Sequence, residues 1–296
     1  MIIEFQVLGL TCRLLYNIFN PLGCWRWKLD PYKVSAETQE SIIDVHIDFL
    51  HSKSKADSLR RDSLLQIETS GFFQHQVWRQ ENGSTLWCYV RKHSDKEYLR
   101  FLVNTDWNKI SLITDCTETA GDLAFEYLGQ IMPIPLLLIH SALTFHGVLM
   151  EYKGNGIIIS APSGTGKTTH ARLWRNSQNA LIINGDRAVI QQEQEKWIGY
   201  GQPWSGTSGE QINRKVPIKA IVVLEQSSFN HIKQITGIEA FGTILPHVQY
   251  VQWNIEIADL TMTLLDRLID SIPVFKFGCR PDLESVYVLK EALEKI

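Results

Sequence analysis

A glycine-rich turn at residues 161–169 carries the residue types with the clearest chemistry, and it reads Ala-Pro-Ser-Gly-Thr-Gly-Lys-Thr-Thr. An apolar run at 156–160 precedes the turn, and a helical pattern begins at Lys167. Glycines in such a turn let successive backbone N–H groups face phosphate oxygens, and a helix N-terminus adds partial positive charge. The lysine can reach the β- and γ-phosphates, and the Thr168 hydroxyl can ligate Mg²⁺. The order strand, loop, helix therefore predicts binding of a nucleoside triphosphate.

The pattern GxxxxGK[ST] is met at every place except the first, where Ala161 replaces glycine. We expect this change to leave the phosphate cradle intact, because the residues after position 161 build it. The alternative is an ordinary turn before a helix with an incidental lysine, which the strand–loop–helix context disfavours. The residues expected to contact the nucleotide are Ser163, Gly164, Thr165, Gly166, Lys167, Thr168 and Thr169.

The next apolar run, 180–183, leads to Asp186 and Arg187. A carboxylate at the polar end of a strand can hold a metal ion or accept the proton of a hydroxyl. A guanidinium group beside it can clamp a transferring phosphoryl group. For each residue a purely structural role is the alternative: Asp186 could cap the turn, and Arg187 could be a surface cation.

Two further features flank this region. His146 and Gly147 end or interrupt a strand upstream of the turn, and a lone histidine is often a structural residue. Downstream, the glycine-rich segment 199–209 either closes over a substrate or serves as a flexible connector beside the cations of 214–219. The residues predicted to contact the substrate are Trp204, Ser205, Gly206 and Arg214.

The elements that would position these residues fall into two regions. Residues 1–132 contain aromatic residues and short alternating runs, which predict a smaller, mainly antiparallel, β-rich (α+β) domain with one or two helices. The expected elements there are a hairpin at 76–90 through Asn82-Gly83, strands at 98–103 and 110–114 joined by a turn at 104–106, and a helix at 121–131 that ends before Pro133. The charged segment 51–62 is expected to be a surface loop.

Residues 133–296 predict an α/β domain. The apolar runs at 143–150, 156–160, 180–183 and 216–224 have the length and composition of strands. Helical patterns occupy 167–175, 259–269 and 282–293.

Composition excludes several classes of protein. The 296 residues carry a formal net charge of -3, from 29 basic and 32 acidic residues, which gives no field that would favour a nucleic acid partner. The five cysteines (Cys12, Cys24, Cys88, Cys116 and Cys279) form no CxxC pair and predict reduced thiols rather than a disulfide framework or a zinc site. The first residues make a poor signal peptide, and no uninterrupted apolar stretch reaches the ~18–20 residues of a spanning helix. We therefore expect a soluble, cytoplasmic protein without a membrane partner.

Three stretches together resemble the catalytic domain of HPr kinase/phosphorylase: His146-Gly147-Val148, the turn at 163–168, and Gly185-Asp186-Arg187. That domain shares its P-loop fold with ATP-dependent phosphoenolpyruvate carboxykinases. The segments 203–206 and 216–219 look like a bacterial subgroup of HPr-kinase-like proteins, some of which phosphorylate a serine on a precursor peptide and others free serine. The resemblance covers residues 136–296 and does not extend to the N-terminal domain.

The resemblance implies nucleotide binding by residues 163–169, Mg²⁺ at Thr168 and Asp186, and an active-site role for His146. HPr kinase has two consecutive aspartates, one acting on the substrate hydroxyl and one on the metal, where this chain has Gly185-Asp186 or, shifted by one residue, Asp186-Arg187. In either alignment a single aspartate remains. Asp186 then performs both tasks, or the base comes from elsewhere, or the kinase activity is altered. The signature loop of HPr kinase is not recognisable, so HPr itself is not the expected substrate. The hexamers of that family leave a homo-oligomer open.

The expected function is an ATP- and Mg²⁺-dependent kinase that transfers a phosphoryl group to a hydroxyl, above all that of serine in a small peptide or protein. The negative charge of the phosphates would be held by Lys167, the loop amides, Mg²⁺ and Arg187. Asp186 or His146 would orient or deprotonate the acceptor. The N-terminal domain would recognise the acceptor or mediate assembly. A free-serine or small-molecule kinase and a nucleotide-dependent regulatory protein stay open as alternatives. Carboxykinase chemistry is disfavoured, because no second-metal set of histidine and lysine is recognisable.

Overall fold

The computed structural model describes residues 2–16, 26–34, 42–48, 62–70, 73–92, 97–113 and 118–296. The chain divides into two compact units, Met1–Pro135 and Leu136–Ile296. Cys24, Cys116 and the charged segment 51–61 lie outside the described residues. Cys12, Cys88 and Cys279 are free cysteines.

The N-terminal unit is built on one eight-stranded sheet, whose order is β1-β2-β3-β8-β7-β6-β5-β4. Its strands are β1 (Ile2–Val7), β2 (Leu10–Tyr16), β3 (Ile42–Asp48), β4 (Ser63–Ser70), β5 (Phe73–Arg79), β6 (Thr85–Arg91), β7 (Glu97–Val103) and β8 (Lys109–Ile113). The hairpin predicted at Asn82-Gly83 is confirmed: β5 and β6 pair antiparallel, and Gly83 has the positive φ that the turn requires (+81°). The sheet is mixed rather than simply antiparallel, because β3 runs parallel to both β2 and β8.

Helix α1 (Arg26–Leu29), the 3₁₀ turn η1 (Asp30–Tyr32) and helix α3 (Glu118–Ile131) complete this unit. The ring of Tyr127 on α3 stacks on that of Tyr89 on β6, with centroids 3.8 Å apart. The predicted helix before Pro133 is confirmed, but a second helix, α4 (Pro133–His140), begins directly at that proline. Proline is well suited to the first helical position, where its missing N–H has no intrahelical partner to lose.

Together α3 and α4 contain a helical stretch, Leu123–His140, that is long and apolar enough to cross a membrane by length and composition alone. Within the structure, 67% of this stretch is buried. Core helices of soluble proteins have the same properties, so the burial agrees with a soluble protein.

The C-terminal unit is a mixed α/β structure. Its strands are β9 (Leu143–Tyr152), β10 (Asn155–Ser160), β11 (Leu181–Asn184), β12 (Arg187–Glu193), β13 (Lys196–Tyr200), β14 (Lys215–Gln226), β15 (His231–Ile235) and β16 (Val274–Cys279). Its helices are α5 (Lys167–Gln178), α6 (Gly237–Ile244), α7 (Ile255–Ser271) and α8 (Leu283–Glu294), with 3₁₀ turns η2 (Gly206–Ser208) and η3 (Leu245–His247). The strands and helices expected from the apolar patterns of this region are therefore confirmed.

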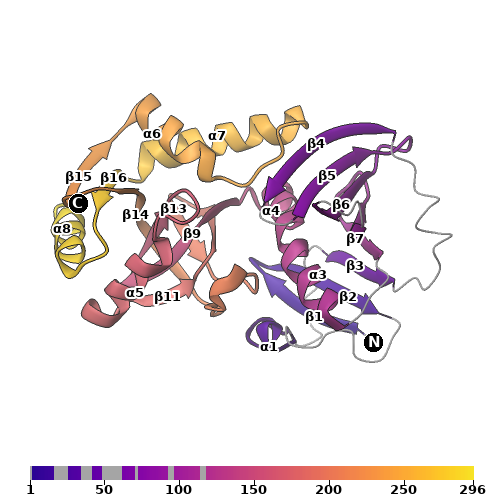
Figure 1. Ribbon diagram of the computed structural model, residues 1–296, viewed down its shortest axis with the longest axis horizontal. Helices are drawn as coiled ribbons and strands as arrows, with labels where there is room; N and C mark the ends of the chain where they lie inside the picture. Colours follow the sequence, from indigo (N-terminus) through magenta and orange to yellow (C-terminus); the bar gives the residue numbers. More distant parts are fainter. Residues whose placement is uncertain are drawn as a thin grey trace. The chain divides into compact units, whose positions relative to one another are not determined.

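The sheet order is β10-β9-β12-β13-β14-β16-β15, with β11 paired to β9 and β10 also paired to β14. β10, β14 and β16 run parallel, whereas β9 is antiparallel to β10, β11 and β12. Alternate residues of β9, β10, β14 and β16 form a core with Trp174 of α5 and Leu289 of α8. Figure 1 shows α6 and α7 on the opposite side of these strands from α5.

One sequence prediction for β9 is wrong. His146 and Gly147 were expected to end or interrupt a strand, but β9 continues through both residues to Tyr152. Gly147 is required there because a Cβ atom would lie 2.9 Å from the carbonyl oxygen of Ile159 on β10. The glycine permits close approach of two strands and does not break the strand.

The core also contains an ionisable residue, His170 on α5, which is 3% exposed and packs edge-on against Phe277. Neither of its ring nitrogens has a hydrogen-bond partner among the described residues. Burial lowers the pKa of His170 to about 4. The side chain is therefore neutral in the folded protein at neutral pH.

We predict that His170 weakens the fold in acid. An unfolded histidine takes up its proton near pH 6.5, whereas folded His170 takes it up only near pH 4, so stability falls as the pH drops between these values. Between pH 8 and pH 5 the free energy of unfolding of the wild type should fall by about 2 kcal/mol more than that of His170→Leu. Urea unfolding of both proteins at the two pH values measures this difference, and the pH 8 comparison isolates the change in packing. Equal acid losses in the two proteins would contradict the prediction.

Candidate functional site

The predicted phosphate-binding turn connects β10 to α5. Gly164 and Gly166 both have left-handed backbone conformations (φ +79° and +111°), and Gly166 is the residue directly before α5. A Cβ atom added at either glycine would meet nothing within 4 Å, so the space beside the turn is open. Ser163 and Thr169 are exposed, and the Thr165 and Thr168 side chains are half-buried at the helix N-terminus. The turn therefore has the backbone shape that can surround an anion.

Lys167 occupies the centre of this turn and is 9% exposed. Its Nζ donates hydrogen bonds to the carbonyl oxygens of Ala161 (2.9 Å) and Pro162 (3.4 Å). Among the described residues, no carboxylate lies within 4 Å of this ammonium group. Burial lowers the pKa of Lys167, and the charge of Asp186 opposes that change. Ala161 is itself fully buried in the core, so the position contributes a carbonyl to the site and a methyl group to the packing.

Asn184, which the sequence analysis did not single out, organises the neighbouring turn between β11 and β12. Its Oδ1 accepts hydrogen bonds from the backbone N–H groups of Asp186 (3.0 Å) and Arg187 (2.8 Å). Its Nδ2 donates to the carbonyl oxygens of Gln202 (2.9 Å) and Trp204 (3.1 Å). This fully buried amide thus joins the turn that carries Asp186 to the glycine-rich loop.

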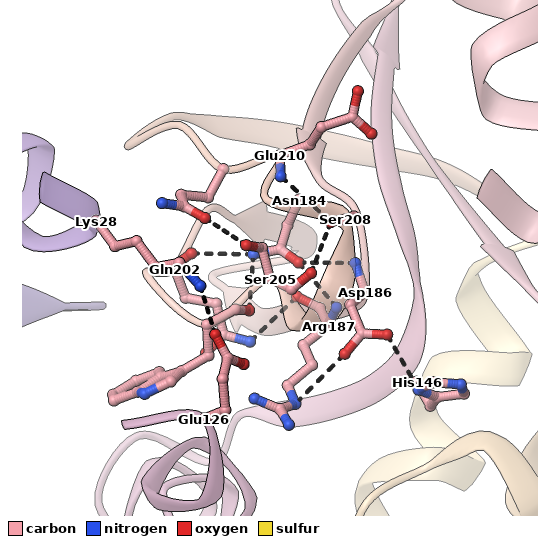
Figure 2. A network of polar contacts seen from close by, with 12 residues as sticks. Lys28, Glu126, His146, Asn184, Asp186, Arg187, Gln202, Ser205, Ser208 and Glu210 are labelled. Carbon is pink, nitrogen blue, oxygen red and sulfur yellow. Dashed lines mark hydrogen bonds and ion pairs between the residues drawn. The ribbon is translucent and has the colours of Figure 1, made fainter. Parts of the chain in front are cut away.

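Asp186 is held at both ends of its backbone, because its carbonyl oxygen also accepts a hydrogen bond from the N–H of Gly147 (2.8 Å). Its side chain points toward His146 and Arg187 (Figure 2). Asp186 Oδ1 lies 3.7 Å from Nδ1 of His146, and Oδ2 lies 3.8 Å from Nε of Arg187. The Asp186 side chain is 25% exposed and that of His146 is 40% exposed, whereas that of Arg187 is 7% exposed. The strand register explains the convergence, since His146 pairs directly with Arg187 across β9 and β12.

The pKa of His146 is lowered from its ordinary value. Burial is the main cause, the charges of Lys167 and Arg187 act in the same direction, and Asp186 opposes them. A neutral imidazole next to a carboxylate can accept or relay a proton from a hydroxyl. The structure therefore brings together all four residues predicted to be catalytic: Asp186, His146, Lys167 and Arg187.

The glycine-rich loop packs closely against Asp186. A Cβ atom at Gly206, where φ is +56°, would lie 2.5 Å from Asp186 Oδ2. Trp204 and Ser205, which were predicted to contact substrate, are fully buried, and the Ser205 hydroxyl donates to Gln211. These two side chains support the loop, whereas Gly206 lies at the site itself.

Glu210 connects the same loop to the helix that begins at Lys167. Its carboxylate lies 2.5 Å from Arg175 and 3.8 Å from Arg172 of α5, and its backbone carbonyl accepts a hydrogen bond from the N–H of Gly185 (2.9 Å). Gly185 is required at its position, because a Cβ there would collide with the hydroxyl of Ser208. A second aspartate directly before Asp186 would therefore require Ser208 to move.

Arg214, the fourth residue predicted to contact substrate, is half exposed and forms a two-pronged ion pair with Glu151 of β9. Lys215 is likewise 3.6 Å from Glu193. The positive charge expected beside the glycine-rich loop is thus partly neutralised by acidic neighbours, and the ion pair and side-chain hydrogen bonds of Arg214 are with Glu151 and not with the residues around Asp186.

The structure adds one ionisable residue that the sequence analysis missed, His247 in η3. It is 9% exposed, and its pKa is lowered by burial and by the charges of Lys167 and His146. A single histidine some eighty residues after the phosphate-binding turn offers no spacing signal, and only the fold brings it close. Groups of three or more histidine, cysteine or acidic side chains that could hold a metal by themselves are absent from the described part of the chain.

Replacing Asn184 should disturb the site through the backbone. Asn184→Leu keeps the volume but leaves two amides and two carbonyls without their partner, and each unsatisfied buried group costs about 1–3 kcal/mol. Asn184→Asp keeps the acceptor but turns a second oxygen toward the carbonyls of Gln202 and Trp204, so it should also lose stability. Urea unfolding followed by tryptophan fluorescence measures both. Asn155→Leu, which removes one hydrogen bond to the Lys153 carbonyl, is the matched control. A loss no larger than in this control would refute the role given to Asn184.

Comparisons with known proteins find similarity over part of the chain. Residues 130–268, slightly less than half of the chain, match a family model described as SynChlorMet cassette protein ScmC. No curated protein matches the chain. Among solved structures, the Hpr(Ser) kinase/phosphatase from Coxiella burnetii is similar, with 12% sequence identity, 51% of this chain and 97% of that chain covered, and a TM-score of 0.32.

Proposed function

We propose that the C-terminal unit binds a nucleoside triphosphate with Mg²⁺ and transfers its γ-phosphoryl group to a hydroxyl. The observation that carries the proposal is the nearly buried ammonium group of Lys167 at a helix N-terminus, without a described carboxylate within 4 Å. A buried charge is stable only when it is paired or solvated by hydrogen bonds. The phosphates of a nucleotide supply the missing negative charge at the place where the turn and the helix can surround them.

The residues fit the ligands that the proposal requires. The left-handed conformations of Gly164 and Gly166 leave open space beside the turn, where side chains would otherwise reduce access to the backbone N–H groups. Mg²⁺ prefers oxygen ligands and usually takes one or two from the protein, with the rest from phosphates and water. The half-buried Thr168 and the partly exposed Asp186 would provide these two oxygens. When bound, Mg²⁺ would neutralise charge on the phosphates.

Phosphoryl transfer asks the protein mainly for positioning and for compensation of charge. In the proposed reaction the hydroxyl oxygen of the acceptor bonds to the γ-phosphorus, the bond to the bridging oxygen of the nucleoside diphosphate breaks, and the hydroxyl proton leaves to Asp186 or His146. Their separation of 3.7 Å and the lowered pKa of His146 support this role for the pair. Arg187, on the other side of Asp186, would hold negative charge on the transferring group.

The acceptor that we favour is a serine hydroxyl in a small peptide or protein, with free serine as the small-molecule alternative. This choice rests on the sequence resemblance described above. In the proposed division of labour, residues 133–296 form the catalytic domain and residues 1–132 recognise the acceptor or mediate assembly. Incubation with ATP, Mg²⁺ and a panel of serine-containing peptides and free serine, followed by mass spectrometry, tests the proposal directly.

One observation favours a second function, that of a nucleotide-dependent regulatory protein. Asp186 is flanked by Gly185 and Arg187, so the chain has one carboxylate where HPr kinase has two consecutive aspartates, and a Cβ at Gly185 would displace the Ser208 side chain. If one carboxylate is insufficient for transfer, nucleotide binding would control the docking of a partner instead. Nucleotide binding without a phosphorylated product from any acceptor in the panel would favour this function over the kinase.

We predict that Lys167 and Asp186 separate binding from turnover. Lys167→Met should weaken ATP binding by about tenfold or more, because it removes a charge-assisted hydrogen bond to phosphate. Asp186→Asn keeps the shape and should retain nucleotide binding while turnover collapses. Calorimetry gives the affinities and mass spectrometry the turnover. Lys196→Met, at an exposed lysine on β13, is the matched control and should behave as wild type. Unchanged ATP affinity in Lys167→Met would contradict the proposed site.

A further inference from the structure

His247 reaches the site from a distant part of the chain. It ends η3, the 3₁₀ turn between α6 and α7, and the two residues after it are fixed to β9. Val248 forms a β-bridge with Phe145, and the N–H of Gln249 donates to the carbonyl oxygen of Thr144 (2.8 Å). Residues 247–249 therefore run alongside the part of β9 that leads directly into His146. The position of His247 is set by backbone hydrogen bonds and does not depend on a flexible side-chain contact.

His247 is mostly buried, but its ring nitrogens are not sealed off in the core. The side chain is 9% exposed, and neither ring nitrogen is among the fully buried polar atoms that lack a hydrogen-bond partner in the described residues. Burial is the main cause of its lowered pKa, followed by the charges of Lys167 and His146. Both of these groups lie in the site, and a neutral imidazole keeps one N–H donor and one acceptor nitrogen. A ring nitrogen that is not sealed in the core can bond to a ligand, and the backbone pairing of Val248 with Phe145 holds this ring alongside the strand that carries His146.

We propose that His247 donates a hydrogen bond to the terminal phosphate of the bound nucleotide. This inference rests on the proposed function, since the charge of Lys167, which would hold the β- and γ-phosphates, also acts on His247. A neutral donor suits this position, because it adds a hydrogen bond without a further buried positive charge beside Lys167 and Arg187. His247 is then a contact that a nucleoside triphosphate satisfies and a nucleoside diphosphate does not.

Calorimetry with two nucleotides tests the inference. The affinities of wild type, His247→Phe and His247→Gln are measured for β,γ-imido-ATP and for ADP, each with Mg²⁺. The phenylalanine keeps the ring but has no donor, whereas the glutamine keeps an N–H donor. His247→Phe should lower the affinity for the ATP analogue by about tenfold and the affinity for ADP by less than about twofold. The reason is that a hydrogen bond to a charged group is lost only with the ATP analogue. His247→Gln should restore most of the affinity. His231→Phe, at an exposed histidine on β15, is the control.

The possible failures differ from one another. If His247→Phe lowers the affinity for both nucleotides equally, the ring only supports the fold. If the affinity for both is unchanged, His247 does not belong to the site. Either result overturns the inference and leaves the proposed function intact. Absence of nucleotide binding by the wild type would overturn the proposed function itself. A selective loss for the triphosphate, restored by glutamine, supports the inference.

Discussion

The nearly buried positive charge of Lys167 is the constraint on which the site depends. Its ammonium group lies at the start of α5, where the helix N-terminus is also positive, and two loop carbonyls hold it in the described structure. Burial of such a group is unfavourable unless negative charge or hydrogen bonds compensate it, and the lowered pKa of Lys167 reflects this cost. The loop is therefore organised to accept an anion, and this physical requirement links the glycine conformations, the helix and the proposed nucleotide.

The opposite half of the site is organised by neutral hydrogen bonds. Asn184 binds four backbone groups, and the Gly147 amide binds the Asp186 carbonyl, so the backbone that carries the Asp186 carboxylate has little freedom to move. Glu210 extends the same rigidity to α5 through Arg175. Charged groups that must act on a reacting centre are most effective when their positions are fixed in advance. The packing of Gly206 against Asp186 shows how tightly the loop encloses this carboxylate.

Prediction from the sequence succeeded where structure is set by neighbouring residues. The hairpin at Gly83, the strand–turn–helix around Lys167 and the helices α7 and α8 each follow from local signals, namely positive-φ glycine, apolar periodicity and capping. It failed where distant strands decide. β9 continues through His146 because Gly147 permits a close approach to β10. From the sequence alone, a glycine that permits close packing of two strands cannot be distinguished from a glycine that ends a strand.

The sequence by itself determined the shape of the glycine-rich turn before α5 and the residue types it contains, because glycine conformations and a helix start are local properties of the chain. It also named the residue types at 146, 186 and 187. Only the tertiary structure decided that these side chains converge, since the register of β9 against β12 and the hydrogen bonds of Asn184 join residues far apart in the chain. The same holds for His247, whose following residue pairs with β9 and whose pKa is lowered in part by the charge of Lys167. Such pairings are non-local, and no spacing along the chain encodes them.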